Sequence, residues 1–266
     1  MITFRELVSG LRGLDIEPHL PVIAHASLSA FGEVKGGGET LLGALLSTVD
    51  TVMMPTFTYK TMLTPEKGPA GNAMRYGSES DLNAMAEFYR PSMPADPLMG
   101  ILPELLRQNA NARRSCHPIF SFAGIGVDAA LEAQNLENPM APVELLMQKN
   151  GWVVLLGVNH RVNTSIHLAE RLAGRKQFLR WALTPQGVVA CPHFNGCSEG
   201  FEKAAFYLSG ITREVVIGNA VVRALSLKLM IPILKEVIEN EPLALLCDHP
   251  DCERCNAVRE AVQGMA

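Results

Sequence analysis

The stretch that decides the fold is GWVVLLGVNHRVNTSIHLAERLAG, residues 151–174. It starts with a continuous apolar run, 152–158, which is typical of a strand buried on both faces. Residues 163–174 then predict the opening turns of a helix. His167 and Glu170 stand three positions apart and therefore share one face of that helix. The sequence places this pair just past the end of a buried strand.

The same alternation of strand and helix extends to both sides of this stretch. Apolar runs predict strands at 20–28, 51–57 and 120–126. Helical spacing predicts helices at 4–14, 38–49, 97–109, 127–135 and 141–150. Further along, the pattern predicts a hairpin at 177–194 joined through TPQG, helices at 198–210 and 219–240, and a strand-like run at 244–247. This alternation predicts an α/β sandwich.

The chain organisation points to a single domain over residues 1–266, although 266 residues would also suit two small domains. Segment 58–96 has little periodicity and is rich in Gly, Pro, Ser and Met. A long irregular stretch of this kind is usually mobile or functional, so we expect it to belong to the active site. A cysteine-rich segment, 247–255, lies close to the C-terminus.

Composition excludes several classes of protein. The residues are 48% hydrophobic and the formal net charge is −4, so no basic footprint for nucleic acid is present. No apolar run reaches the roughly 18 residues of a membrane span, and the N-terminus does not have the pattern of a signal peptide. Six cysteines without such a signal predict thiols or a metal site in a reducing, cytoplasmic compartment.

Two loops have features of an anion site. Segment 25–40, HASLSAFGEVKGGGET, leads from a strand through glycines into a helix, and backbone N–H groups at a helix start bind anions. It matches neither the Walker loop nor the dinucleotide fingerprint. Segment 113–126, RRSCHPIFSFAGIG, adds two arginines that can hold phosphate. The alternatives are a plain turn before a helix and a solvated basic turn.

The His167–Glu170 pair suits acid–base chemistry. A carboxylate on one imidazole nitrogen fixes the tautomer and raises basicity, so that the other nitrogen can take a proton. Ligand sites in α/β sheets gather beyond the carboxyl ends of strands, where this pair is predicted to lie. Two alternatives remain at this stage: a zinc-dependent hydrolase site formed with His25, and a surface pair without a role.

The cysteines near the C-terminus have the spacing of metal ligands. CDHPDCERC supplies Cys247, Cys252 and Cys255, and thiolates two to four residues apart suit tetrahedral zinc. We expect these three to lie close together and to hold structural zinc. Cys197 is the fourth ligand that we favour; Cys191, His193 and His249 are the alternatives. Free buried cysteines are the competing interpretation.

Taken together, the segments resemble a known family. HASLSAFGEVKGGGETLLGALL, VMMPTFTY, DPLMGILPELLR, RRSCHPIFSFAGIG and NTSIHLAERLAG occur in the order and with roughly the spacing of aminoglycoside 3-N-acetyltransferases. NGCSEGFEKA and IGNAVVRAL continue the likeness, which covers roughly residues 20–225. The resemblance implies a single α/β sandwich around a mixed central sheet, unlike the Gcn5-type acetyltransferases.

The resemblance also implies an activity that uses acetyl-CoA as co-substrate. In this family the histidine corresponding to His167 is the general base and the glutamate corresponding to Glu170 orients it. Acetyl would pass directly to the amine, and we rank Cys116 below His167 as a rival nucleophile. The implied coenzyme A positions are His25, Ser27, Leu28, Ser29, Gly32, Val34, Arg114, Ser115, His117 and Ser121. Arg114→Ala should then weaken coenzyme A binding and leave stability nearly unchanged.

The implied substrate is the 3-amino group of an aminoglycoside, which connects the family to antibiotic resistance; another small amino compound is the alternative. A pocket for several ammonium groups should be lined with carboxylates. The predicted substrate-binding residues are Tyr59, Glu66, Glu79, Asp81, Asn163 and Thr164, with Glu87 and Asp96 as further acidic candidates in the irregular segment. Neither nucleic acid nor membrane is an expected partner.

Overall fold

Three of the predicted apolar runs form the parallel centre of a seven-stranded sheet in the computed structural model, which describes residues 1–77 and 83–264. β1 (Val22–Ala26) lies between β2 (Val52–Pro55) and β6 (Trp152–Leu156) and runs parallel to both. Nearly every residue of these strands is buried, as the uninterrupted apolar runs predict. Their carboxyl ends therefore reach the same edge of the sheet.

Antiparallel strands complete the sheet on both sides, so the sheet is mixed, as predicted. The strand order is β4-β5-β2-β1-β6-β10-β9. The four outer strands are β4 (Arg113–Arg114), β5 (Phe122–Ile125), β9 (Arg213–Ile217) and β10 (Ala220–Ser226).

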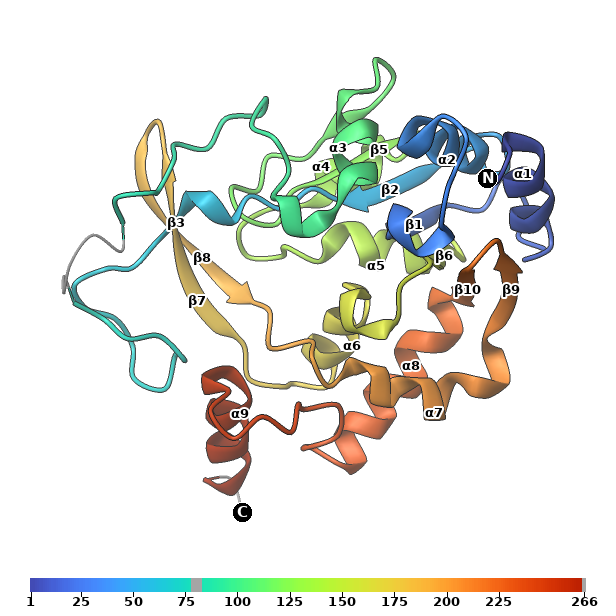
Figure 1. Cartoon of the computed structure of the whole chain (residues 1–266). Helices are drawn as coiled ribbons and strands as arrows, with labels where there is room; N and C mark the ends of the chain where they lie inside the picture. The colour runs from blue at the N-terminus through green and yellow to red at the C-terminus, as the bar shows by residue number, and fades with distance from the viewer. Residues whose placement is uncertain (78–82, 265–266) are drawn as a thin grey trace.

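Helices cover both faces of this sheet because its side chains alternate between two apolar cores. Val22, Val52 and Val154 face one core, together with α1 (Phe4–Arg12), α2 (Gly37–Leu46) and α3 (Ile101–Gln108). Ile23, Met53 and Val153 face the other. The helices that contribute to this second core are α4 (Asp128–Ala133), α5 (Ala141–Gln148), α6 (Ile166–Leu172), α7 (Ala204–Leu208), α8 (Leu227–Asn240) and α9 (Glu253–Gln263). The result is the predicted α/β sandwich (Figure 1).

A smaller antiparallel sheet stands beside the sandwich (Figure 1). It contains β3 (Met62–Leu63), β7 (Phe178–Thr184) and β8 (Gly187–Phe194), and α9 (Glu253–Gln263) follows near the C-terminus. The irregular segment is fastened to this sheet, because the Asn72 side chain exchanges two hydrogen bonds with the backbone of Leu179. No helix in residues 1–77 and 83–264 is long and apolar enough to cross a membrane.

Two predictions about the last third of the chain are wrong. Residues 219–240 do not form one helix, because the first part is β10 and only the second part is α8. The missed signal is a two-residue Gly218–Asn219 connection, at which Ile217 pairs with Ala220 and Gly218 has a φ of 59°. The run 244–247 forms no strand, because residues 244 and 245 belong to a turn and Leu245, at a φ of 62°, leaves the extended conformation that a strand needs.

Candidate active site

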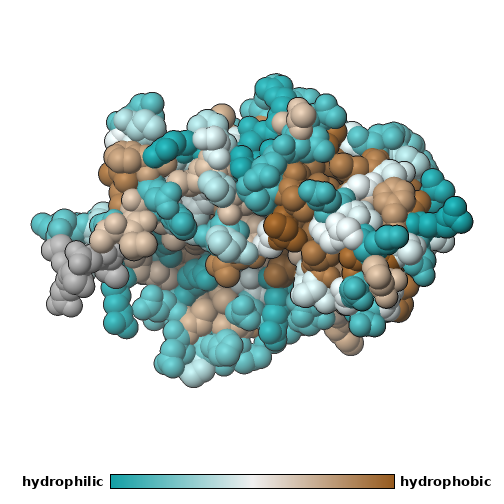
Figure 2. Space-filling view, turned by 45° about the horizontal axis from the view of Figure 1, so that its top comes forward, coloured by the Kyte–Doolittle hydropathy of each residue, from teal (hydrophilic) through white to brown (hydrophobic). Residues whose placement is uncertain are grey.

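A cavity of about 920 Å³ opens where the three parallel strands end. The end of β1 and the residue after it contribute His25 and Ser27, the end of β2 and the segment after it contribute Pro55 and Phe57, and the segment after β6 contributes His167. Its position agrees with the rule that ligands bind beyond the carboxyl edge of such sheets. Leu98, Ile101 and Val162 also line the cavity and remain exposed. Figure 2 shows such hydrophobic side chains among hydrophilic ones on one face of the molecule.

α6 positions the predicted acid–base pair at this cavity. Asn163 helps to start the helix, because its Oδ1 accepts a hydrogen bond of 3.2 Å from the backbone N–H of Ser165. His167 Nδ1 lies 2.7 Å from Glu170 Oε2, and both side chains are buried. Since Nδ1 is engaged, Nε2 is the ring nitrogen available to a molecule in the cavity.

A residue that sequence reasoning missed completes this arrangement. Arg175 Nη1 donates to Glu170 Oε1 at 2.9 Å, and its Nη2 donates to the backbone carbonyls of Pro242 and Ala244. Burial opposes ionisation of Glu170, but the hydrogen bond and charge of His167 and the charge of Arg175 outweigh it and lower the pKa of this carboxyl. Arg175 follows α6 by only three residues, which was the one available signal.

His25 offers an uncharged polar group to the same cavity. Burial lowers its pKa to about 3, so the imidazole is neutral at physiological pH. Among the described residues, no protein group bonds to its buried Nε2. Two hydroxyl groups follow at the end of β1, with Ser27 Oγ 3.1 Å from Ser29 Oγ. This end of the cavity is therefore polar without a fixed charge.

The structure divides the predicted coenzyme A residues into two sets. His25, Ser27, Leu28, Ser29 and Gly32 line the cavity together. Val34 instead forms a parallel bridge with Ile2, and the neighbouring backbone groups of Glu33 and Lys35 bond to Ile2. The second set, from the 113–121 loop, is engaged mainly with the protein itself.

Arg114 shows this engagement most clearly. Its guanidinium donates to Ser121 Oγ at 3.1 Å, to Thr56 O at 2.6 Å, and to the carbonyls of Pro91 and Met93. These bonds fasten the irregular segment to the sheet. These contacts argue against the expectation that Arg114→Ala would leave stability nearly unchanged, and we now expect this substitution to lower stability.

The other members of the loop also bond to backbone groups. Ser115 Oγ accepts from Phe122 N–H at 2.9 Å, and Ser121 Oγ donates to Thr56 O at 2.9 Å. His117 Nδ1 accepts hydrogen bonds from the backbone N–H groups of Ile119 and Phe120. Burial lowers the pKa of His117 to about 4. Its Nε2 is buried without a protein partner among the described residues.

The predicted substrate residues also divide. Tyr59, Asn163 and Thr164 line the cavity, whereas Glu66 is exposed on the irregular segment outside the lining. Glu79 and Asp81 lie outside the described residues. The further candidates have other contacts, because Glu87 pairs with Lys60 and Asp96 caps the turn at 97–99.

Three charged lining residues were not predicted. Arg161 and Glu199 pair at 3.7 Å, and Arg254 reaches the cavity from α9. In the part of the chain that the structure describes, Glu199 supplies the one carboxylate of the lining. A carboxylate-rich pocket is thus not found among these residues.

The cysteines are free thiols, and four of them come together. Cys197, Cys247, Cys252 and Cys255 place their sulfur atoms within 4.8 Å of one another. Cys191 is buried elsewhere, in β8, and Cys116 is exposed.

The alternative of a zinc-dependent hydrolase requires a cluster of metal ligands at the cavity. Within residues 1–77 and 83–264, His25, His167 and Glu170 do not form a converging metal-ligand group. Both oxygens of Glu170 are already bonded, to His167 and to Arg175.

Comparison with known proteins decides the family. A profile described as aminoglycoside 3-N-acetyltransferase matches residues 23–239. The chain belongs to this family. The resemblance of the sequence segments is thereby confirmed, and membership makes the chain an acyltransferase.

Its relatives are distant but cover most of the molecule. Aminoglycoside N(3)-acetyltransferase III of Salmonella sp is 28% identical over 262 residues, covering 83% of this chain and 85% of the relative. Aminoglycoside N(3)-acetyltransferase IX of Micromonospora chalcea is 33% identical over 183 residues, covering 65% and 63%. The solved apoenzyme of AAC(3)-IVa has the same fold, with a TM-score of 0.80, 24% identity and 98% coverage of each chain.

Proposed function

We propose that this acyltransferase moves acetyl from acetyl-CoA directly to an amine of an aminoglycoside, with His167 as general base and Glu170 as its positioning residue. The observation that carries the proposal is the buried His167–Glu170–Arg175 chain at the cavity, with His167 Nδ1 engaged 2.7 Å from the carboxylate. With Nδ1 bound to the carboxylate, Nε2 is the nitrogen that can accept a proton from a group in the cavity.

The chemistry needs one proton to move twice. The amine nitrogen attacks the thioester carbonyl, and His167 Nε2 takes the proton that nitrogen must lose as the C–N bond forms. The C–S bond then breaks, and the imidazolium returns the proton to the departing sulfur. Glu170 stabilises the imidazolium between the two transfers, and Arg175 keeps the carboxylate ionised.

The strand-end side of the cavity suits coenzyme A. His25 is neutral, and Ser27 and Ser29 offer hydroxyls, while the exposed Leu98 and Ile101 of the adjoining segment 97–103 offer apolar surface. A polar, uncharged surface beside an apolar one matches the amides and methylenes of the coenzyme's arm. A solved structure with this fold is a binary complex of AAC-IIIb with CoASH. We propose His25, Ser27, Leu28, Ser29 and Gly32 as its contacts.

The aminoglycoside follows from the family and from Tyr59, Asn163 and Thr164 at the cavity. A variant of AAC(3)-IVa, 25% identical to this chain, has been solved with a gentamicin. A specific observation favours a second candidate, an amine that also carries an anionic group. Arg161 and Arg254 line the cavity, and Glu199 is the one carboxylate in the described lining. This balance suits an anionic substituent better than a compound with several ammonium groups.

Thiol release from acetyl-CoA, measured with a panel of aminoglycosides, simple amines and amino acids, tests the proposal. Mass spectrometry should detect one added acetyl group on the amine that supports release. We expect turnover with an aminoglycoside, and turnover with amino acids alone would select the second candidate. Acetylated enzyme accumulating in a burst would contradict direct transfer.

A further inference from the structure

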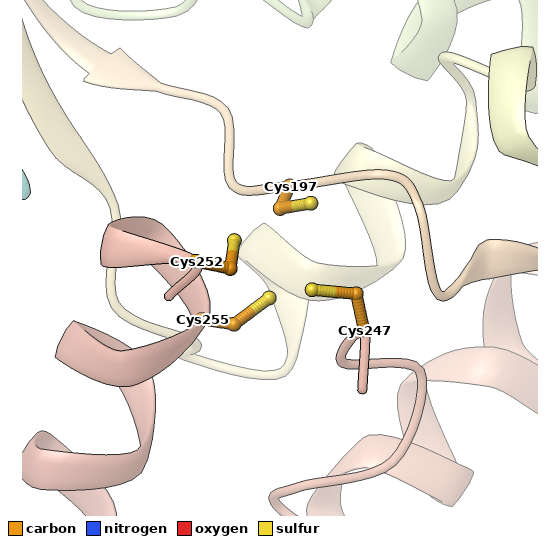
Figure 3. A group of neighbouring side chains, drawn as sticks. All are labelled: Cys197, Cys247, Cys252 and Cys255. Carbon is orange, nitrogen blue, oxygen red and sulfur yellow. The ribbon is translucent and has the colours of Figure 1, made fainter. Parts of the chain in front are cut away.

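Four cysteines converge at one place, where three of them belong to the second apolar core and Cys252 packs against it. Cys197 follows β8, Cys247 lies on the turn after α8, and Cys252 and Cys255 stand at the start of α9. Figure 3 shows their sulfur atoms around one small space between these segments. Three of the side chains are buried and Cys252 is half-buried. Segments separated by about 50 residues thus bring thiols to one place, and no other ligand type joins them among residues 1–77 and 83–264.

The spacing of the sulfur atoms fits one tetrahedral ion. A Zn–S bond of about 2.3 Å places tetrahedral thiolates about 3.8 Å apart. The four Sγ atoms lie within 4.8 Å of one another, so small side-chain rotations close the site. A cluster of four irons binds each sulfur to a different metal and needs a wider cage. All-thiolate ligands also exclude the oxygen-preferring ions calcium and magnesium.

We propose that these four cysteines bind a structural zinc ion, which fastens α9 and segment 195–199 to the body of the protein and thereby fixes one wall of the active-site cavity.

Without a metal, the attachment of α9 to the rest of the protein is modest. Its buried residues in the described part are the ligand Cys255 and the small side chains Ala257 and Val258, which join the second apolar core, and Arg259 donates to the carbonyl of Cys247. An isolated helix of 11 residues is marginally stable in water. Its salt bridge from Glu253 to Arg75 is exposed and therefore weak. A metal that joins its first turn to two other segments supplies the missing stability.

The cysteine cluster is connected to the active-site cavity through neighbouring residues. Arg254 stands between two of the ligands, lines the cavity, and donates from Nη1 to the carbonyl of Gly196 at 2.9 Å. Gly196 precedes the ligand Cys197 and packs against Glu170, since a Cβ there would lie 3.6 Å from Glu170 Oε2. Glu199 lines the cavity two residues further on. Loss of the metal should therefore disturb the side of the cavity formed by residues 194–199 and Arg254, whereas the residues proposed to contact coenzyme A, such as His25, Ser27 and Ser29, should keep their positions.

The metal itself is tested without any assay of activity. Protein purified without chelators should contain one zinc per chain by plasma mass spectrometry. Cobalt exchanged into the site should give the visible absorption and thiolate charge-transfer bands of a tetrahedral tetrathiolate. Cys252→Ser and Cys255→Ser should lose the metal, whereas Cys116→Ser and the buried control Cys191→Ala should keep it. Two results would overturn the proposal: wild-type protein that contains no metal although it was produced with added zinc, or wild-type protein that contains iron instead of zinc. Both are measured on the wild-type protein, so they do not depend on whether the cysteine variants fold.

The wall is tested by hydrogen exchange on wild-type protein, before and after a strong chelator. Exchange should rise in 195–199 and 247–263 and stay constant in α1, and added zinc should reverse the change. Unchanged exchange in 195–199 after the metal has been removed would refute the coupling.

The kinetic arm rests on the proposed function. Metal removal should raise KM for the amine several-fold and leave coenzyme A affinity unchanged; loss of coenzyme A affinity alone would contradict the assignment of the wall. If wild-type protein turns over no amine, the proposed function fails, while metal content and exchange still decide the zinc site.

Discussion

The two sides of the cavity are held by different means. The strand-end wall, His25, Pro55 and His167, stands directly on the buried parallel strands β1, β2 and β6. The loop wall consists of lining residues from segments 97–103 and 194–199 together with Arg254. It is held by side chains such as Arg114, Glu104 and the four cysteines, which bond within or next to these segments. The proposed base thus stands on buried parallel strands, whereas much of the surface that would recognise a substrate depends on side-chain contacts between loops.

The largest effect should come from the strand-end wall. His167→Ala removes the proposed base, so kcat should fall by about 10²–10⁴-fold while coenzyme A affinity, measured by calorimetry, stays unchanged. Glu170→Gln should lose part of the activity, and Cys116→Ala and the exposed control His19→Ala should lose almost none. Full turnover in His167→Ala would move the chemistry away from this wall.

Arg175 links the chemistry to stability. Arg175→Ala leaves the buried Glu170 carboxylate without its cation and two carbonyls without their donor, so the free energy of unfolding should fall by about 3–5 kcal/mol. Lys176→Ala, at the next position, serves as the control in the same urea titrations. A loss confined to activity, with normal stability, would mean that Arg175 acts only on the charge of Glu170.

The His167–Glu170 pair and Arg175 also show which features of the site can be predicted from sequence. The run 152–158 and the spacing of His167 and Glu170 are local, and local patterns predicted the strand, the helix and the shared face. The partners of Arg175 are carbonyls more than 60 residues away, and no periodicity encodes such a contact. The cysteine grouping was predictable because thiols are rare and their spacing is characteristic. β10 was wrongly predicted as the start of a helix, because its apolar residues fit the spacing of a helix as well as that of a strand. The Gly218–Asn219 turn before it, which indicates a hairpin, was overlooked.

Arg114 tests the side chains that hold the loop wall. Arg114→Ala removes hydrogen bonds to three backbone carbonyls and to Ser121, so stability should fall by about 2–3 kcal/mol. Arg113→Ala is a matched control, since Arg113 makes only exposed ion pairs with Asp128 and Glu132 and should cost less than about 1 kcal/mol. Equal losses of stability in the two variants would show that Arg114 does not hold the irregular segment in place. If Arg114→Ala is stable but binds coenzyme A more weakly, Arg114 is instead a coenzyme A ligand.

Glu104 gives the loop wall a dependence on pH. Burial raises the pKa of this carboxyl, but hydrogen bonds from Arg107, from the backbone N–H of Ala95 and from Gln108 outweigh it and lower the pKa to about 2. A folded pKa below the unfolded value of 4.5 stabilises the protein above about pH 4.5, and this contribution is lost as pH falls toward 2. The stability gap between wild type and Glu104→Gln should therefore narrow by about 1 kcal/mol from pH 7 to pH 4 in urea titrations. A gap that is constant over this range would show that the carboxyl titrates normally.

The smallest effect should come from the rim of the loop wall, and it bears most directly on the substrate. Glu199 is exposed and pairs with Arg161 at 3.7 Å, so its interaction with a substrate cation is screened by water and should be worth less than about 1 kcal/mol. Glu199→Gln should raise KM two- to five-fold for an amine with several ammonium groups, about the range that this energy allows, and kcat should not change. An amine with a single positive charge serves as the internal control and should be affected less. If KM instead falls for a substrate with an anionic group, the freed Arg161 is the binding partner, because the substitution removes a competing carboxylate. That result would identify the loop wall as a site for an acidic amino compound, with the base on the strand-end wall unchanged.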